Sequence, residues 1–210
     1  MGRTMSGLYA VTPDTADTSA LLAGVEAALA GGARALQYRN KAADAALRRR
    51  QGAALLELCR RYHAPLIIND HLDLALALDA DGAHIGADDG PIAPARTMLG
   101  ADKILGASCY HRFETALAAQ QAGADYVAFG SFFPSNVKPD AVRAPLSLLT
   151  EAKQRLTVPV VAIGGITPDN APQLIAAGAD AVAVISALFG APDVLAAARR
   201  FAGLFDGPPS

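Results

Sequence analysis

The feature that most constrains the fold is an eightfold alternation of short apolar runs with longer alanine-rich segments. Each run is four to six residues long and rich in Val, Ile, Leu, Ala or Tyr, which is typical of buried β-strands. Strands are expected at 7–12, 35–39, 66–69, 82–86, 104–108, 126–130, 159–164 and 181–186. The spacing of apolar residues and the flanking glycines predict helices at 18–32, 44–63, 71–79, 91–100, 113–123, 168–178 and 192–205.

The pattern amounts to eight strand–helix units of about 25 residues each, with no helix range assigned after the sixth strand, and it predicts an α/β fold of the (β/α)8 TIM-barrel type. A doubly wound sheet is the alternative, but it usually has fewer strands. The stretches AGGARAL, AGADYV and AGADAV support the repeat, because each joins a helix end to the next strand. We expect a single domain over residues 1–210, with flexible ends at 1–6 and 206–210.

The composition argues against several classes of protein. A net charge of −2 provides no basic field for nucleic acid or for an anionic membrane. No run approaches the roughly 18–20 apolar residues of a membrane span, and the N-terminus lacks the apolar region of a signal peptide. The cysteines, Cys59 and Cys109, have no CxxC spacing, so a cytoplasmic protein without a disulfide framework is expected.

In such barrels the chemistry lies where strands end, so the polar residues at those positions are the candidates for a site. The second strand ends with Gln37, Arg39 and Lys41, which share a face if the strand continues through them. An amide and two cations on one face are suited to holding a polyphosphate. The alternative is the solvated start of a loop.

Carboxylates follow the next two strands. Asn69 and Asp70 end the third strand, and Asp88 and Asp89 follow the fourth. Each pair could simply cap the following helix. Because the strands are neighbours, Asp70 and Asp89 could instead hold Mg2+, which binds one or two carboxylates together with substrate phosphates.

Later strand ends carry weaker signals. Ser108 ends the fifth strand and could donate a hydrogen bond to a phosphate, whereas Cys109 has no nearby base and is expected to be a packed thiol. His84 lies among apolar residues within the fourth strand and is expected to be a satisfied core histidine. Gly165, after the seventh strand, and Ser186, at the end of the eighth, lie where barrels of this kind often bind phosphate through backbone N–H groups.

The stretch FGSFFPSNVKPDAVRAP at 129–145 follows the sixth strand and contains one early lysine, Lys138. A loop of this length could be a linker. At the mouth of a barrel, however, a lysine could grip a phosphate, and the loop could act as a lid.

Seven stretches in order carry a resemblance to a known family: QYRNK, IINDH, ADGAHIGADDG, ILGAS, GADYVAFGSFFPS, VVAIGGITPDN and AVAVIS. Together they resemble the thiamine-phosphate synthase (thiamine-phosphate pyrophosphorylase) family, over about residues 7–190. The resemblance implies a magnesium-dependent transferase. It joins 4-amino-5-hydroxymethyl-2-methylpyrimidine diphosphate to thiazole phosphate, and the C–O bond to diphosphate breaks first. Such a reaction requires leaving-group stabilisation and water exclusion more than proton transfer.

The resemblance also implies roles for individual residues. Those matching the family's site are Gln37, Arg39, Lys41 and Asn69 for the pyrimidine diphosphate, Asp70 and Asp89 for Mg2+, Ser108 for the diphosphate, Ser135 and Lys138 in the long loop, and Gly165, Ile185 and Ser186 for the thiazole phosphate. Arg39, Ser108 and Lys138 are the expected catalytic residues. The partners are small molecules, and a homo-oligomer is possible.

One position departs from the family pattern. The family has Thr before the loop lysine, whereas this chain has Val137, which lacks the hydroxyl. Three alternatives stay open. The first is a thiazole tautomerase-like relative, which would not need the set of Gln37, Arg39 and Lys41. The second is a non-catalytic phosphate-ligand-binding homologue, which only Val137 favours, and the third is another phosphate-sugar barrel enzyme, which GGIT alone suggests.

Overall fold

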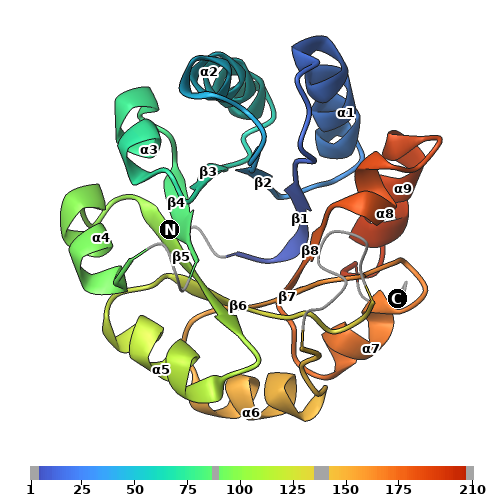
Figure 1. Cartoon of the computed structure of the whole chain (residues 1–210). Coiled ribbons are helices and arrows are strands. Elements are labelled where there is room, and N and C mark those ends of the chain that lie inside the picture. The colour runs from blue at the N-terminus through green and yellow to red at the C-terminus, as the bar shows by residue number, and fades with distance from the viewer. Residues whose placement is uncertain (1–4, 87–89, 135–141, 207–210) are drawn as a thin grey trace.

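Eight parallel strands close into a barrel in the order of the chain, and the helices surround it (Figure 1). The computed structural model describes residues 5–86, 90–134 and 142–206. The strands are β1 (Gly7–Val11), β2 (Ala35–Tyr38), β3 (Leu66–Asn69), β4 (Gly82–Ile85), β5 (Ile104–Tyr110), β6 (Tyr126–Phe129), β7 (Val160–Ile163) and β8 (Ala181–Val184). β1 pairs with both β2 and β8, which closes the barrel and confirms the expected TIM-barrel fold.

The helices of the described residues follow the expected alternation, with additions near β6 and β8. They are α1 (Thr18–Ala30), α2 (Ala45–Arg61), α3 (Leu72–Leu78), α4 (Ile92–Leu99), α5 (Phe113–Gln121), α6 (Ser147–Arg155), α7 (Ala171–Ala176), α8 (Ser186–Phe189) and α9 (Val194–Ala202). The sequence pattern assigned no range to α6, although its apolar residues Leu148, Leu149 and Ala152 are buried at helical spacing. β5 also extends beyond its expected end, to Tyr110, through a register shift against β6.

The apolar core has two layers, and this explains why the strands are apolar throughout. Within β1, Leu8 and Ala10 face the helices, whereas Tyr9 and Val11 face the barrel interior. Successive strand residues point to opposite sides, and both sides of this sheet are buried. At the bottom of the interior layer, Met5 is also buried. The ends at 1–6 and 206–210 were predicted to be flexible. Most of their residues, 1–4 and 207–210, lie outside the described residues, so this stays a prediction.

Aspartates before alternate strands tie neighbouring strands together at the amino ends of the barrel. Asp81, Asp125 and Asp180 precede β4, β6 and β8, and their carboxylates accept backbone hydrogen bonds from the starts of β3, β5 and β7. The three distances are 2.9, 2.7 and 2.9 Å. The aspartates in the AGADYV and AGADAV stretches therefore stabilise the end of the barrel opposite the strand ends that carry the candidate residues.

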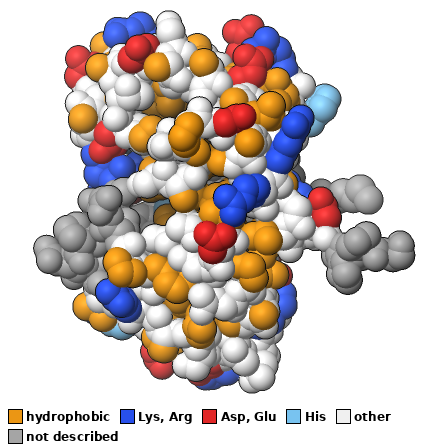
Figure 2. All heavy atoms as spheres, turned by 90° about the vertical axis from the view of Figure 1, so that its right-hand side faces the viewer, with side chains coloured by type: hydrophobic (Ala, Val, Ile, Leu, Met, Phe, Trp, Pro, Cys, Tyr) orange, Lys and Arg blue, Asp and Glu red, His pale blue; other side chains and the backbone are white. Residues whose placement is uncertain are grey.

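The outer surface is mixed in character. On the face shown in Figure 2, positive and negative side chains are interspersed with apolar and uncharged ones. Within the described parts of the chain, no helix is both long enough and apolar enough to span a membrane.

Candidate active site

A cavity of 440 Å³ lies at the carboxyl ends of the strands, and residues from all eight strands line it. Polar side chains from β2, β3 and β5 lie on its wall, and Val161, Ile163 and Ala183 from β7 and β8 make an apolar wall. An apolar cavity with a few polar groups that converge on it is the usual form of a small-molecule site.

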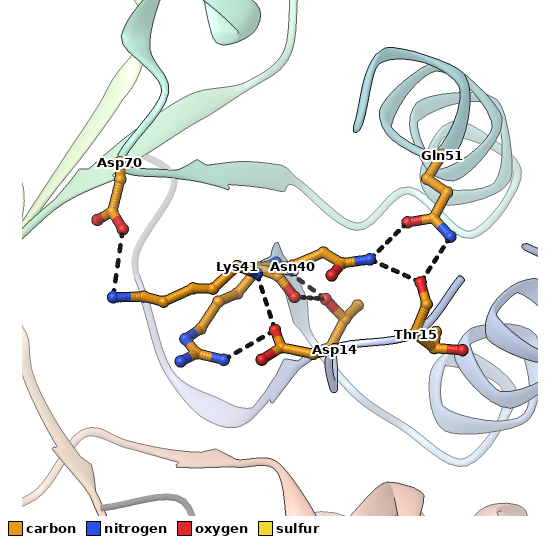
Figure 3. Close-up of polar contacts among 8 residues, drawn as sticks. Asp14, Thr15, Asn40, Lys41, Gln51 and Asp70 are labelled. Atoms are coloured by element: carbon orange, nitrogen blue, oxygen red, sulfur yellow. Dashed lines mark hydrogen bonds and ion pairs between the residues drawn. The ribbon is translucent and has the colours of Figure 1, made fainter. Parts of the chain in front are cut away.

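Gln37, Arg39 and Lys41 all line this cavity, as the sequence pattern predicted. The expected cause, a strand that continues through all three residues, was partly wrong. β2 ends at Tyr38, so the strand itself orients only Gln37. Beyond it, Asn40 is buried on the opposite side, where its amide nitrogen donates to Thr15 O at 2.7 Å and Gln51 Oε1 at 3.0 Å. This anchor maintains the alternation past the strand end (Figure 3).

The Arg39 side chain is positioned by Asp14, which follows β1. Its guanidinium donates to Asp14 Oδ1 at 3.1 Å, and the same oxygen accepts from the Lys41 backbone N–H at 2.9 Å. The Arg39 backbone is held as well, because Thr12 Oγ1 accepts from its N–H at 2.9 Å and donates to its carbonyl at 2.8 Å. Neither Asp14 nor Thr12 was predicted to be part of the site.

Asp70 lies across from Lys41 at the edge of the cavity. Lys41 Nζ is 3.9 Å from Asp70 Oδ2, and Figure 3 shows the lysine extended toward the carboxylate. The Asp70 side chain is 19% exposed, so the carboxylate is accessible to a ligand while most of it is enclosed. The N-cap position of α3 is His71, without a side-chain cap bond, so Asn69 and Asp70 do not occupy the capping position that the alternative interpretation required.

A chain of hydrogen bonds crosses the base of the cavity from β2 to β5. Gln37 Nε2 lies 2.9 Å from Tyr9 Oη, which lies 2.8 Å from Tyr126 Oη. Tyr126 Oη is 2.9 Å from His84 Nδ1, and His84 Nε2 is 2.8 Å from Ser108 Oγ. His84 is therefore a satisfied core histidine, as expected, and it also contacts the predicted phosphate donor.

The ends of the long loop after β6 meet beside the cavity. The Ala144 N–H donates to Ser131 O at 2.9 Å, and the Phe133 N–H donates to Gly164 O at 3.1 Å, in the turn after β7. Ser131 and Val142 both line the cavity. The loop thus begins and ends at the mouth of the barrel, which does not suit a linker between distant elements.

The residues predicted to bind a second phosphate are grouped after β7 and β8. Ile185 lines the cavity, and Gly165 and Ser186 directly follow the lining residues Gly164 and Ile185. Asp88, Asp89, Ser135, Val137 and Lys138 lie outside the described residues.

The two thiols are buried in the outer core layer. Burial raises the pKa of both Cys59 and Cys109 to about 12, so neither thiol is an activated nucleophile. Cys109 is the packed thiol that the sequence indicated.

Sequence reasoning missed several groups of the site, among them Tyr9, Tyr126 and Arg112. The available signal was a polar aromatic residue in an otherwise apolar strand, because a buried tyrosine hydroxyl requires a hydrogen-bond partner. A tyrosine in an apolar strand therefore predicts that its hydroxyl has a hydrogen-bond partner, but it does not identify the partner residue.

Comparisons with known proteins show the family of this chain. The family model described as thiamine monophosphate synthase matches residues 8–188. The chain belongs to the thiamine monophosphate synthase family. This confirms the family indicated by the seven stretches and, with it, the expectation that the chain is an enzyme.

Relatives of this family match over nearly the whole chain. The thiamine-phosphate synthase of Methylobacillus flagellatus is 59% identical over 202 residues, which cover 96% of each chain, and that of Thiobacillus denitrificans is 57% identical over 97% of this chain and 96% of its own. The structure of thiamine phosphate pyrophosphorylase from Pyrococcus furiosus superposes with a TM-score of 0.86 at 38% identity and covers 97% of both chains.

Proposed function

We propose that this chain is a thiamine-phosphate synthase that joins 4-amino-5-hydroxymethyl-2-methylpyrimidine diphosphate to thiazole phosphate and releases diphosphate. The single observation that carries the proposal is the convergence of one amide, two cations and a hydroxyl, from Gln37, Arg39, Lys41 and Ser108, on one cavity. A tautomerase or a simple phosphate-sugar enzyme has no need of this set.

In the proposed reaction the C–O bond to diphosphate breaks first, and the electron pair leaves with the diphosphate. The thiazole nitrogen then forms the new C–N bond. Arg39 and Lys41 stabilise the departing negative charge, and Ser108 donates a hydrogen bond to it. Val161, Ile163 and Ala183 exclude water, which would otherwise capture the pyrimidine-methyl cation. Gly165, Ile185 and Ser186 bind the thiazole phosphate through backbone N–H groups.

Mg2+ is the cofactor we propose, and the donor set suits it. Asn69 and Asp70 offer oxygen ligands at the cavity edge, and Mg2+ uses one or two carboxylates with substrate phosphates. In the part of the chain that the structure describes, no three His, Cys, Asp or Glu side chains are grouped to hold a metal by themselves. We propose that Asp89 and the substrate diphosphate would supply the remaining ligands. When bound, the ion would neutralise charge on the leaving diphosphate.

Ser135 and Lys138 complete the proposal, with the long loop as a lid. The support comes from the two ends of the loop, since Ser131 and Val142 line the cavity and the Phe133 N–H is bonded to the turn after β7. Lys138 lies midway in the sequence between Pro134 and Val142, and we propose that it binds the leaving diphosphate.

The test is to mix the full chain with both substrates and Mg2+ and to measure thiamine phosphate and diphosphate in equal amounts. The matched control omits only the thiazole phosphate, and no thiamine phosphate is expected from it. Tight binding of both substrates by a folded chain that forms no product would replace the synthase with the phosphate-ligand-binding homologue.

A further inference from the structure

The hydrogen-bonded chain beneath the cavity contains five side chains from five strands and ends at a predicted catalytic residue. Its members are Gln37 (β2), Tyr9 (β1), Tyr126 (β6), His84 (β4) and Ser108 (β5). The first four are at most 6% exposed and Ser108 is half-buried, and all of the five except Tyr126 line the cavity. Because so little of the first four side chains is exposed, their polar groups are satisfied mainly by their neighbours in the row.

Both phenols keep their protons. Burial raises the pKa of Tyr9 and of Tyr126 well above the ordinary value for tyrosine. Each hydroxyl therefore has one hydrogen to donate and can accept in return. In a buried row of such groups, the direction of one hydrogen bond determines the direction of the next.

The Gln37 amide sets that direction, because its nitrogen can only donate. Tyr9 accepts from Gln37 Nε2 and so turns its own hydrogen to Tyr126. Tyr126 in turn donates to His84 Nδ1, which must then carry no proton. The remaining nitrogen, Nε2, carries the proton of the neutral ring and donates to Ser108 Oγ. The hydrogen of Ser108 is then left to point into the cavity.

The packing holds the rings in this order. The Tyr126 and His84 rings stack with their centroids 5.6 Å apart, and Tyr9 meets Tyr126 edge-on at 5.9 Å. Gly106, on β5, makes room for the Tyr126 ring, because a Cβ at that position would lie 2.1 Å from Tyr126 Cζ. Rotation of Tyr126 away from its partners is therefore restricted.

We propose that this row is a relay of fixed direction, in which His84 is a positioning residue that holds Ser108 as a hydrogen-bond donor to the anionic leaving group. The link to the leaving group rests on the proposed function, whereas the tautomer of His84 does not. In the opposite direction, Gln37 would accept from Tyr9, and Ser108 would donate to His84 and have no hydrogen for the ligand.

The direct test is nitrogen NMR of the full chain, with ¹⁵N-labelled histidine and no substrate. We expect the His84 ring to be protonated at Nε2 and unprotonated at Nδ1, with its signals identified by their loss in His84→Gln. A ring protonated at Nδ1, or at both nitrogens, would overturn the relay. This result stands even if the chain forms no thiamine phosphate.

Two matched variants test the effect on turnover. Tyr126→Phe removes the group that donates to His84 Nδ1, whereas Tyr9→Phe leaves Tyr126 able to donate. We expect kcat to fall about tenfold in Tyr126→Phe and by a clearly smaller factor in Tyr9→Phe, with KM little changed. Both variants break the link from Gln37 to His84, so both are expected to mix the His84 tautomers, and Tyr126→Phe more strongly because His84 Nδ1 then has no hydroxyl partner. A His84 ring that stays protonated at Nε2 alone in Tyr9→Phe would show that Gln37 does not set the direction.

A second pair covers the case in which Tyr126→Phe does not fold. His84→Gln retains an acceptor and an N–H donor, whereas His84→Met has a similar length and no N–H group. We expect His84→Gln to retain about tenfold more turnover than His84→Met. Equal activity of the two variants would contradict the positioning role.

Discussion

At the scale of the residue, the Arg39 guanidinium illustrates how a cation is held ready for a ligand. Asp14 Oδ1 accepts from it at 3.1 Å, and the side chain is 15% exposed. A guanidinium held in this way loses little freedom when it binds an anion, and its planar fork can bond two oxygens.

Replacing Arg39 tests that role. We expect Arg39→Ala to lower kcat/KM for the pyrimidine diphosphate about 10- to 100-fold, because charge-assisted hydrogen bonds contribute about 1.5–3 kcal/mol. Steady-state kinetics measure the loss. Arg34→Ala is the control, since Arg34 precedes β2 at the opposite end of the barrel. A similar loss in both variants would mean that the effect is not local to the cavity.

Asp70 combines an unusual backbone with a charged side chain. Its φ is +61°, in the left-handed region that asparagine and aspartate tolerate better than most residues. Asp70→Asn therefore keeps the shape and the backbone preference while it removes the charge. We expect the Mg2+ concentration for half-maximal turnover to rise about tenfold or more.

The control for Asp70→Asn is Asp73→Asn, in the exposed first turn of α3. Titration of turnover with Mg2+ compares the two variants. If Asp70→Asn has the same magnesium dependence as the unaltered chain, Asp70 is not part of the metal site.

At the scale of the element, the turn after β7 and the loop after β6 depend on each other. Gly165 has a φ of +65°, and a Cβ there would lie 2.3 Å from Pro134 O and 2.7 Å from Phe133 O. The residue must therefore be glycine for two reasons, the backbone conformation and the close approach of the loop.

A pair of glycine variants separates these reasons. Gly100 has a φ of +81° and a ψ of 175°, and a Cβ at that position would have no neighbour within 4 Å, so Gly100→Ala adds backbone strain alone, of about 1–3 kcal/mol. We expect Gly165→Ala to reduce the free energy of unfolding by more than Gly100→Ala and to lower turnover, because the loop must move. Urea denaturation and kinetics measure both effects. Equal destabilisation with full turnover would show that the loop is not coupled to the turn.

At the scale of the whole molecule, closure of the barrel depends on many equivalent contacts between strands. Asp180 is one of them: its carboxylate accepts from the Val160 N–H at 2.9 Å and also pairs with Lys153. Its side chain is 26% exposed, so the bond lies near the protein surface without being fully solvated.

We expect Asp180→Ala to lower the free energy of unfolding by about 1–3 kcal/mol, because the Val160 N–H loses its acceptor. The matched control is Asp169→Ala, which removes an ion pair with Arg200. The Asp169 side chain is 85% exposed. Such surface pairs contribute about 0–1 kcal/mol. Urea denaturation measures the loss in the free energy of unfolding for the two variants. An equal loss would mean that the hydrogen bond at the strand end stabilises the fold no more than a surface ion pair does.

Much of this molecule follows from local sequence. Apolar runs such as 126–130 indicate strands because both faces of the sheet are buried, and their regular alternation with helices predicts a barrel. The chemistry of barrels lies at strand ends, so Gln37, Arg39 and Asp70 could be selected without a structure. Their hydrogen-bonding partners, such as Asp14 and Thr12, could not.

What the sequence alone determined is the architecture, the family and the strand ends that form the site, because these depend on residues near one another in the chain. The tertiary structure alone decided the contacts across the barrel interior. Tyr9 and Tyr126 are 117 residues apart, and their hydroxyls meet at 2.8 Å only because eight strands close in one register. No local pattern encodes that register, since it results from the packing of every strand against its neighbours.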